Sequence, residues 1–344
     1  MDQVTQFALG AAAAQAVGTH VLGRRAWIVG GVAGLLPDLD MALVPLADPL
    51  FPIELHRTVT HGLVMVPVLA ALTTVLLLPF RPFRARWGAV FLLAGVGALT
   101  HAPLDVLTSY GTMALWPFSH EWLAWDVVSI IDPVYTLTLV VGVVLAARRV
   151  TPRPARIALV VSCLYLLLGV VQRERALDTQ AALAAARGHE PTHARVIPSL
   201  GGPLVWRSLY VADGRIHVDA VRLIPFREPE VQESGSVAAF TPDDLPAALP
   251  DRPHVAEVFA RYHVFTDGFA ARTPGDEAVV GDMRYTLAYG FDPVWGVRLV
   301  EGEDARWVER ATDRMAGILR LTAMALGTAG RFHPLHLVGR PPPR

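Results

Sequence analysis

The sequence predicts a mostly α-helical, multi-pass membrane protein of about six helices, with a C-terminal α+β domain outside the cytoplasm. The first observation behind this fold class is composition: 53% of the 344 residues are hydrophobic, 18% are charged, and the mean hydropathy is +0.40. A soluble protein carries about a quarter charged residues, so disorder, coiled coils and nucleic-acid binding are excluded and membrane residence is expected. The single cysteine, Cys163, lies in an apolar run, which excludes a disulfide framework and a cysteine-based zinc site.

The second observation is that uncharged runs concentrate before residue 173. Residues 3–23 and 26–37 contain no charged side chain apart from the arginine pair between them, and residues 62–80 form a run of 19. At 1.5 Å per residue this last run is about 28 Å long, close to the hydrocarbon core of a bilayer. Three shorter runs reach spanning length with their flanks: 87–100, 133–147 and 157–172. We therefore expect six helices in a membrane domain of residues 1–172. We expect no cleaved signal peptide, because no basic segment precedes the first run.

The third observation is the uneven distribution of arginine among the connections between these runs. The connections after the first, third and fifth helices contain nine arginines and no acidic residue. The alternate connections, residues 38–61 and 104–132, contain eight acidic residues and one basic residue, Arg57. Because short cytoplasmic loops retain arginine, we expect the acidic connections, the N-terminus and residues 173–340 outside the cytoplasm. Two arginines just after the sixth helix argue mildly against this orientation.

Residues 173–340 have the composition of a soluble α+β domain. Strands at 205–211 and 215–223 are expected to pair through a tight turn at Asp213 and Gly214. The other expected elements are a helical stretch to about residue 187, helices at 255–263 and 304–326, strands at 283–290 and 294–300, and a proline-rich tail from residue 340.

Side chains that bind metals gather in the two acidic connections. Asp38 and Asp40 follow Pro37, which breaks helical geometry and lets both carboxylates turn to one side. His101 and Asp105 are four residues apart, so on a helix both project from one face and can hold one ion. The ligand candidates are Asp38, Asp40, His56, His61, His101 and Asp105. Six side chains exceed the four ligands of a tetrahedral ion. Either two divalent ions bind, with zinc the expected metal, or some of the six orient the others.

Each of these residues also has a structural interpretation. An Asp-x-Asp pair after a helix commonly forms a cap or a turn, and histidines are ordinary residues at a membrane interface. Ionisable groups at the edge of a membrane helix are costly to bury and tend to mark sites, which favours a metal site over a polar packing network.

Three further residues of these connections are candidates for catalytic roles. Arg57 is expected to hold an anionic group such as a phosphate. Asp126 or Asp132 is expected to act as a general base or to orient a ligand histidine, with a plain helix cap as the alternative.

One motif match is rejected. Residues 189–193, His-Glu-Pro-Thr-His, fit the zinc-protease pattern H-E-x-x-H, which requires a helix to place both histidines on one face. Pro191 inside the motif and Gly188 before it make an uninterrupted helix unfavourable. We expect a polar linker here.

Several spaced motifs resemble one family. They are Met1–Gln6, Leu36–Asp40, His56–His61, Thr100–Asp105, Thr108–Thr112, Trp116–Phe118 and Ile131–Thr136. In type and order they are similar to the YdjM-like bacterial inner-membrane proteins, which are described as metal-dependent hydrolases. The resemblance covers roughly residues 1–145. Much of that family has histidine where Gln6 stands, which implies that one ligand is missing here or replaced by a water or an amide oxygen. A weaker likeness, in the order His, Asp, His and His-x-x-x-Asp, is to zinc-dependent phospholipases C.

The sequence therefore predicts a membrane-bound hydrolase that uses a divalent metal, zinc being expected, at the outer face of the bacterial cytoplasmic membrane. Membrane lipids are the expected partners and a lipid phosphoester is the expected substrate, since the site lies at headgroup depth. The competing interpretation is a non-enzymatic membrane protein, either a transporter or a metal-stabilised scaffold for the outer domain. The residues identify neither the substrate nor the oligomeric state.

Overall fold

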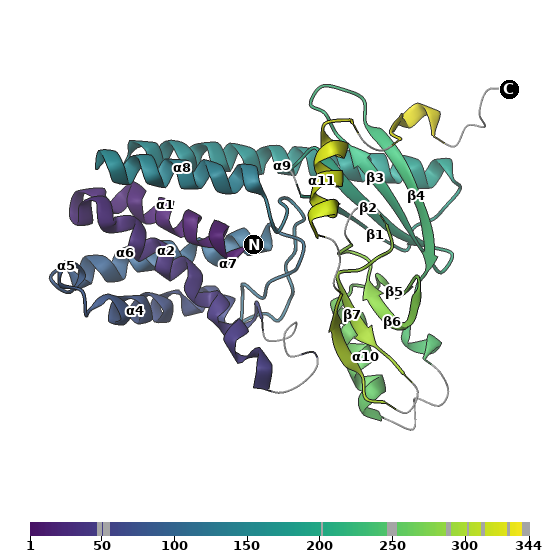
Figure 1. The fold of residues 1–344 in the computed structure, drawn as a ribbon, viewed down its shortest axis with the longest axis horizontal. Helices are drawn as coiled ribbons and strands as arrows, with labels where there is room; N and C mark the ends of the chain where they lie inside the picture. The colour runs from purple at the N-terminus through teal and green to yellow at the C-terminus, as the bar shows by residue number, and fades with distance from the viewer. Residues whose placement is uncertain are drawn as a thin grey trace. The chain divides into compact units, whose positions relative to one another are not determined.

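The computed structural model describes most of the chain and divides it into two compact units (Figure 1). The first unit comprises Met1–Ala47 and Glu54–Val170, and the second comprises Asp48–Ile53 and Val171–Arg344. The described residues are 1–46, 50, 56–200, 202–245, 253–286, 290–300, 303–310, 314–328 and 331–338. Two acidic residues of the connection at 38–61, Asp48 and Glu54, lie outside the described residues, as does the proline-rich tail from residue 340.

Small residues let the helices of the first unit pack closely. Helix α1 spans Gln3–Leu22 and α2 spans Ala26–Leu35, joined by a 3-10 turn at Gly23–Arg25. A Cβ on Gly10 would lie 2.3 Å from the carbonyl oxygen of Gly30, so the two backbones meet directly. The remaining helices are α4 (Val66–Leu77), α5 (Arg81–Arg84), α6 (Trp87–Leu99), α7 (His101–Val106), α8 (Pro133–Arg149) and α9 (Arg153–Ala186).

Two stretches of the described chain are long and apolar enough to cross a membrane, Trp87–Val106 and Arg153–Ala186. A third apolar stretch, Leu63–Leu77, is shorter. The prediction of a helical part rich in apolar residues is confirmed, but two such stretches do not establish six spanning helices. The six expected helices correspond to α1, α2, α4, α6 with α7, α8, and α9.

The expected single spanning helix over residues 62–80 is wrong. Gly62 is extended (φ −61°, ψ 133°), a 3-10 turn follows, and α4 begins only at Val66. A Cβ at Gly62 would lie 2.9 Å from the carbonyl oxygen of Trp116, so this backbone is pinned against another segment. Helix α4 ends at Leu77, two residues before Pro79, because a proline has no N–H to continue the hydrogen bonds of a helix.

The sixth helix and the helical stretch expected to about residue 187 form one continuous helix. Helix α9 runs without a break for 34 residues, from Arg153 through residue 172 to Ala186. Alanine and arginine are strong helix formers, so the charged segment after residue 172 continues the helix. The chain leaves α9 where Gly188 adopts a left-handed φ of 71°.

Over its described residues the second unit contains two antiparallel sheets, the C-terminal part of α9 and two further α-helices. One sheet has the order β1-β2-β3-β4-β9 and the other has the order β5-β6-β7-β8. In the first sheet the strands are β1 (His193–Pro198), β2 (Val205–Ala212), β3 (Arg215–Arg222), β4 (Glu230–Ala238) and β9 (His333–Pro334). In the second they are β5 (Ala270–Thr273), β6 (Asp276–Asp282), β7 (Trp295–Arg298) and β8 (Arg306–Glu309). The further helices are α10 (Pro253–Phe265) and α11 (Arg314–Ala325).

The expected α+β character of this unit is confirmed, with two errors in its elements. The β2–β3 hairpin turns at Asp213 and Gly214, both with positive φ, as expected, and β7 and α10 lie where the sequence placed them. The strand expected at 283–290 is wrong over residues 283–286, where only an isolated bridge at Thr286 forms after β6 ends at Asp282, and residues 287–289 lie outside the described residues. Of the helix expected at 304–326 only α11 forms, because Arg306–Glu309 pair with β7 instead.

Candidate metal centre

Three segments of the first unit bring the predicted ligands together. Helix α2 ends at Leu35 and continues as a 3-10 helix, Leu36–Leu46, that carries Asp38 and Asp40. His61 is the last residue of a 3-10 turn, Val59–His61, that precedes α4. His101 and Asp105 lie one helical turn apart on α7.

Four donor atoms from these segments form a closed group. The Nε2 atom of His61 lies 3.3 Å from Oδ1 of Asp38 and 3.5 Å from Oδ2 of Asp105. The Nε2 atom of His101 lies 3.5 Å from the same Asp38 oxygen and 3.4 Å from the same Asp105 oxygen. All four side chains are at most 7% exposed. We call Asp38, His61, His101 and Asp105 the four-donor cage.

The spacing in this cage fits one divalent ion. Zinc binds histidine nitrogen and carboxylate oxygen at about 2.0–2.2 Å, so tetrahedral ligands lie about 3.3–3.6 Å from one another. Four of the six separations that a tetrahedral shell requires, 3.3–3.5 Å, lie in this interval, and the donor atoms of His61, His101 and Asp105 all lie within 4.8 Å of one another. A network held only by direct hydrogen bonds would show shorter separations, since such bonds are usually 2.7–3.2 Å long.

Both cage histidines are held through the ring nitrogen that faces away from the cage. Nδ1 of His101 lies 2.7 Å from the carbonyl oxygen of Gly34, so this nitrogen donates its proton and Nε2 faces the cage. Nδ1 of His61 lies 3.0 Å from the Thr60 hydroxyl. Partners behind the ring that fix a histidine's orientation are typical of metal ligands.

Buried polar atoms without hydrogen-bond partners cluster at the cage. Within the described residues they include Nε2 of His101, Oδ2 of Asp105 and Oδ2 of Asp38. Leaving such atoms unpaired in the interior costs about 1–3 kcal/mol each. The donor chemistry and these atoms together fit a cation at this position.

The other oxygen of Asp105 is fully occupied. Oδ1 accepts a hydrogen bond from the Gln6 side-chain amide at 2.9 Å and also contacts the amino group of Met1. The Arg57 guanidinium lies 3.5 Å from this oxygen. These contacts turn Oδ2 towards the histidines.

Asp40 lies behind the histidines, so the expectation that both aspartates turn to one side is wrong. Its Oδ1 lies 2.9 Å from Nδ1 of His56, and its Oδ2 accepts a hydrogen bond from Thr60 at 2.7 Å. On a 3-10 helix with three residues per turn, side chains two residues apart point about 120° apart. The 3-10 geometry after Pro37 therefore sends Asp38 into the cage and Asp40 to the outer side of the ring nitrogens.

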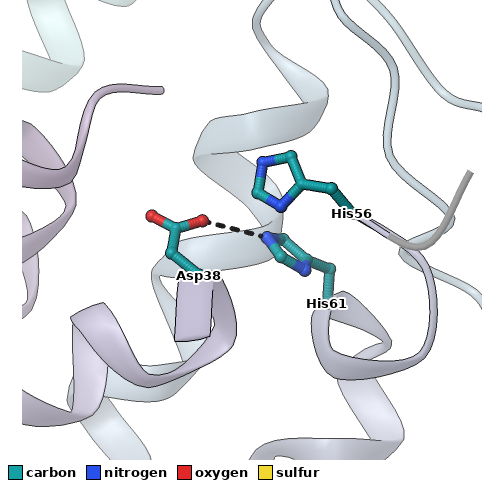
Figure 2. A group of neighbouring side chains, drawn as sticks. All are labelled: Asp38, His56 and His61. Atoms are coloured by element: carbon teal, nitrogen blue, oxygen red, sulfur yellow. Dashed lines mark hydrogen bonds and ion pairs between the residues drawn. The ribbon is translucent and has the colours of Figure 1, made fainter. Parts of the chain in front are cut away.

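His56 lies at the edge of the site. Figure 2 shows the Asp38 carboxylate directed at His61, with the His56 ring beside that histidine. Donor atoms of Asp38, His56 and His61 lie within 4.8 Å of one another, so His56 could also reach an ion. Its side chain is 14% exposed, more than any residue of the cage.

The charge states of two cage residues suit a cation. Burial lowers the pKa of His61 to about 4, so the imidazole is neutral at neutral pH, the form that binds metal. Burial alone raises the pKa of Asp38, but the neighbouring side chains of His101 and His61 outweigh it and leave that pKa below its ordinary value. Asp38 is therefore a carboxylate at neutral pH.

Gln6 belongs to the site. It is fully buried, its amide nitrogen donates to Asp105 and to the His101 carbonyl oxygen, and its Oε1 has no hydrogen-bond partner in the described part of the chain. Sequence reasoning named this position only through the family resemblance. Thr60 contacts His61 and Thr108 contacts Arg57, so both threonines position residues of the site. The sequence did not predict these roles, because neither the residue type nor the spacing of a loop threonine indicates a functional site.

Arg57 lies against the cage in a strained backbone conformation. Its φ is 66°, a left-handed value that costs a non-glycine residue on the order of 1 kcal/mol and is common at functional sites. Its guanidinium donates to Thr108 at 2.9 Å, lies 4.7 Å from the Tyr110 ring centroid, and is 4% exposed as a side chain. The guanidinium lies 3.5 Å from Oδ1 of Asp105, so the arginine also serves to neutralise a cage carboxylate.

The two other catalytic candidates lie on the segment before α8. Asp132 caps α8: it accepts hydrogen bonds from the Tyr135 backbone N–H at 3.0 Å and from the Tyr165 hydroxyl at 2.7 Å. These contacts match the cap interpretation of this residue. Asp126 is buried with a left-handed φ of 53°, between two residues whose N–H groups bond the end of α7.

The rejection of the H-E-x-x-H match is confirmed. His189 lies in the turn after α9, and His193 begins β1, so no helix joins them. Nδ1 of His189 lies 2.9 Å from the Tyr210 hydroxyl, whereas Nε2 of His193 lies 3.1 Å from Asp267.

The apolar helices and the buried histidine and aspartate side chains at their ends define a membrane protein with a candidate metal centre. A sequence profile of the family described as YdjM inner membrane protein matches residues 1–176, and the chain belongs to this family. It is accordingly an inner-membrane protein, as the motifs indicated.

Other comparisons give little beyond the family. The chain is similar to the uncharacterized protein YfhP of Bacillus subtilis (strain 168), with 30% identity over 97 residues. That match covers 28% of this chain and 29% of the relative, so the chain spans less than a third of that protein. No solved structure matches the chain.

Proposed function

We propose that this protein is a multi-pass, metal-dependent hydrolase of the inner membrane, with the four-donor cage as the binding site of a divalent ion. The observation that carries the proposal is the set of four separations of 3.3–3.5 Å among buried nitrogen and oxygen donors from three segments. Zinc is the expected metal, because imidazole and carboxylate donors at this spacing suit it. When bound, such an ion supplies Lewis acidity towards water and towards the oxygen of a scissile ester.

His56 is the proposed general base. The Asp40 carboxylate lies 2.9 Å from its Nδ1, which keeps the proton on that nitrogen and leaves Nε2 as the acceptor. A carboxylate behind a histidine orients the ring and stabilises its protonated form, so Nε2 can take a proton from water. The sequence assigned this role to Asp126 or Asp132, but the structure places Asp132 at a helix cap.

A lipid phosphoester is the proposed substrate class. The cage lies where α2 ends and α7 begins, and helix ends in a membrane unit lie near the lipid headgroups. Arg57 supplies a fixed positive charge beside the cage, and its Nε has no hydrogen-bond partner within the described residues. A guanidinium binds phosphate oxygens through pairs of N–H groups.

A metal-stabilised scaffold is the second candidate function. Four protein ligands complete a tetrahedral shell, which is typical of structural zinc sites, whereas a catalytic ion keeps a position open. If the protein is a scaffold, the metal bound in the cage stabilises the fold and takes part in no reaction.

A hydrolysis screen separates the two functions. Purified full-length protein is incubated with phosphoester lipids and soluble phosphodiesters, before and after chelation and zinc reconstitution. If the protein is a hydrolase, chelation should remove its activity and zinc should restore it. The His56→Gln variant should then keep its metal but lose activity. Metal-loaded protein that hydrolyses none of these substrates, and whose melting temperature alone falls on chelation, would support the scaffold.

The proposed location at the outer face has its own test. A reporter that works only in the cytoplasm, fused after Arg344, is expected to be inactive. An active reporter would move the site to the cytoplasmic face.

A further inference from the structure

An apolar groove runs between α8 and α9 in the first unit, away from the metal centre. Its volume is about 860 Å³, within the range of ligand pockets. Its lining extends along α8 from Val134 to Arg149, a distance of about 22 Å at 1.5 Å per residue. The groove is therefore long enough for an extended acyl chain.

The shape of the groove follows from a small residue on each helix. Gly142 of α8 lies against Ala158 of α9, and a Cβ on this glycine would lie 2.2 Å from the Cβ of that alanine. These two residues form a shallow floor. Leu137 and Ile157, which are 61% and 63% exposed, form walls on either side.

The groove ends at positive charge. Arg149, the last residue of α8, and Arg153, the first residue of α9, both line it and both are exposed. The connection between the helices, residues 147–157, contains four arginines and no acidic residue. An apolar trough that opens onto two arginines is complementary to a ligand with a hydrocarbon chain and an anionic head.

We propose that this groove binds an anionic phospholipid, with an acyl chain along α8 and α9 and the phosphate at Arg149 and Arg153. The site is separate from the proposed substrate site, because Asp132 caps the opposite end of α8, where Thr136 contacts Thr5, the neighbour of Gln6 at the metal centre. The arginine distribution assigns the Arg149 end to the cytoplasmic leaflet, which is rich in anionic lipids. The proposal holds for a hydrolase and for a scaffold alike.

Lipid binding to the purified full-length protein tests this site. Native mass spectrometry would measure binding of phosphatidylglycerol and phosphatidylcholine with identical acyl chains. We expect phosphatidylglycerol to bind more tightly, and the Arg149→Gln/Arg153→Gln variant to bind it about 30-fold more weakly, since each arginine near an anionic headgroup contributes about five-fold. Phosphatidylcholine binding should change little.

Two further variants keep the test specific. Arg81→Gln/Arg84→Gln removes the same charge from another exposed basic connection and should leave phosphatidylglycerol binding unchanged. Val141→Trp fills the groove from an exposed position and should weaken binding of both lipids while the arginines remain. Equal loss in the two double-arginine variants, or displacement of the lipid by inorganic phosphate, would overturn the proposal.

Discussion

A histidine lies four residues from a second potential metal ligand in each unit, His101 with Asp105 and His189 with His193, and of these two pairs only the first brings its side chains together. On α7, Nε2 of His101 lies 3.4 Å from Oδ2 of Asp105. In the second unit, His189 and His193 contact different partners, Tyr210 and Asp267. A spacing of four residues indicates shared ligation only where the chain is helical, because 3.6 residues per turn then align the side chains.

Burial separates the two regions further. His101 and Asp105 are each 1% exposed, whereas the His193 side chain is 42% exposed and its Nε2 lies 3.1 Å from a carboxylate oxygen of Asp267. Unpaired buried donors need a partner, but an exposed histidine is satisfied by water or a neighbouring carboxylate. The burial of the side chains therefore indicates a metal site more strongly than the four-residue spacing does.

The largest expected effect is on metal content. His101→Ala/Asp105→Ala removes two of the four cage donors, so the purified protein should lose its bound ion, a fall of more than ten-fold by elemental analysis. The matched control, His189→Ala/His193→Ala, should keep the wild-type content. Equal metal content in both double variants would contradict the claim that His101 and Asp105 bind the ion and that His189 and His193 do not.

Arg57→Gln should lower kcat/KM by about 10²-fold on the best phosphoester found, the scale observed when one preorganised charge-stabilising group is removed. Metal content should remain. Arg57→Lys should restore activity only in part, because an ammonium cannot make the paired hydrogen bonds of a guanidinium. Full activity of the glutamine variant would remove the anion-binding role and favour a neutral ester or amide.

Asp40→Asn should weaken metal binding by about 10- to 100-fold, because Asp40 supports the ring nitrogens of His56 and His61 from behind. Asp38→Asn, which removes the charge of a cage donor, should weaken it more. Competition with a chromophoric chelator measures both affinities. A larger loss of metal affinity in Asp40→Asn than in Asp38→Asn would indicate that Asp40 is itself a metal ligand.

Asp132→Ala should have the smallest effect. Loss of the α8 cap should cost about 1 kcal/mol of stability, the usual value for an N-cap residue. A small fall in melting temperature with unchanged metal content would assign the residue to the cap. Loss of the ion in this variant would instead connect Asp132 to the cage.

The sequence predicted which residues gather at the site but not the role of each. The i, i+4 spacing of His101 and Asp105 sufficed because α7 is helical. The separation of Asp38 from Asp40 depended on a 3-10 helix, which spacing and composition do not distinguish from a turn. Gln6 could not be placed from spacing, since its contact with Asp105 spans 99 residues.

The same limit explains the errors in the second unit. The β2–β3 hairpin was predictable because its turn residues, Asp213 and Gly214, are local signals. The strand β6 was missed because its last four residues, 279–282, are all buried, which removes the alternation that marks a strand. The segment Arg306–Glu309 has helical spacing but pairs with β7, so a contact distant in sequence decides its structure.

X-ray absorption at the zinc edge of the purified wild-type protein tests the central claim most directly. The four-donor cage predicts one ion per chain with a first shell of four or five nitrogen and oxygen atoms at about 2.0–2.2 Å, including two imidazoles. A sulfur ligand, a six-coordinate shell of oxygen alone, or a protein that cannot be loaded with any divalent ion would contradict the account.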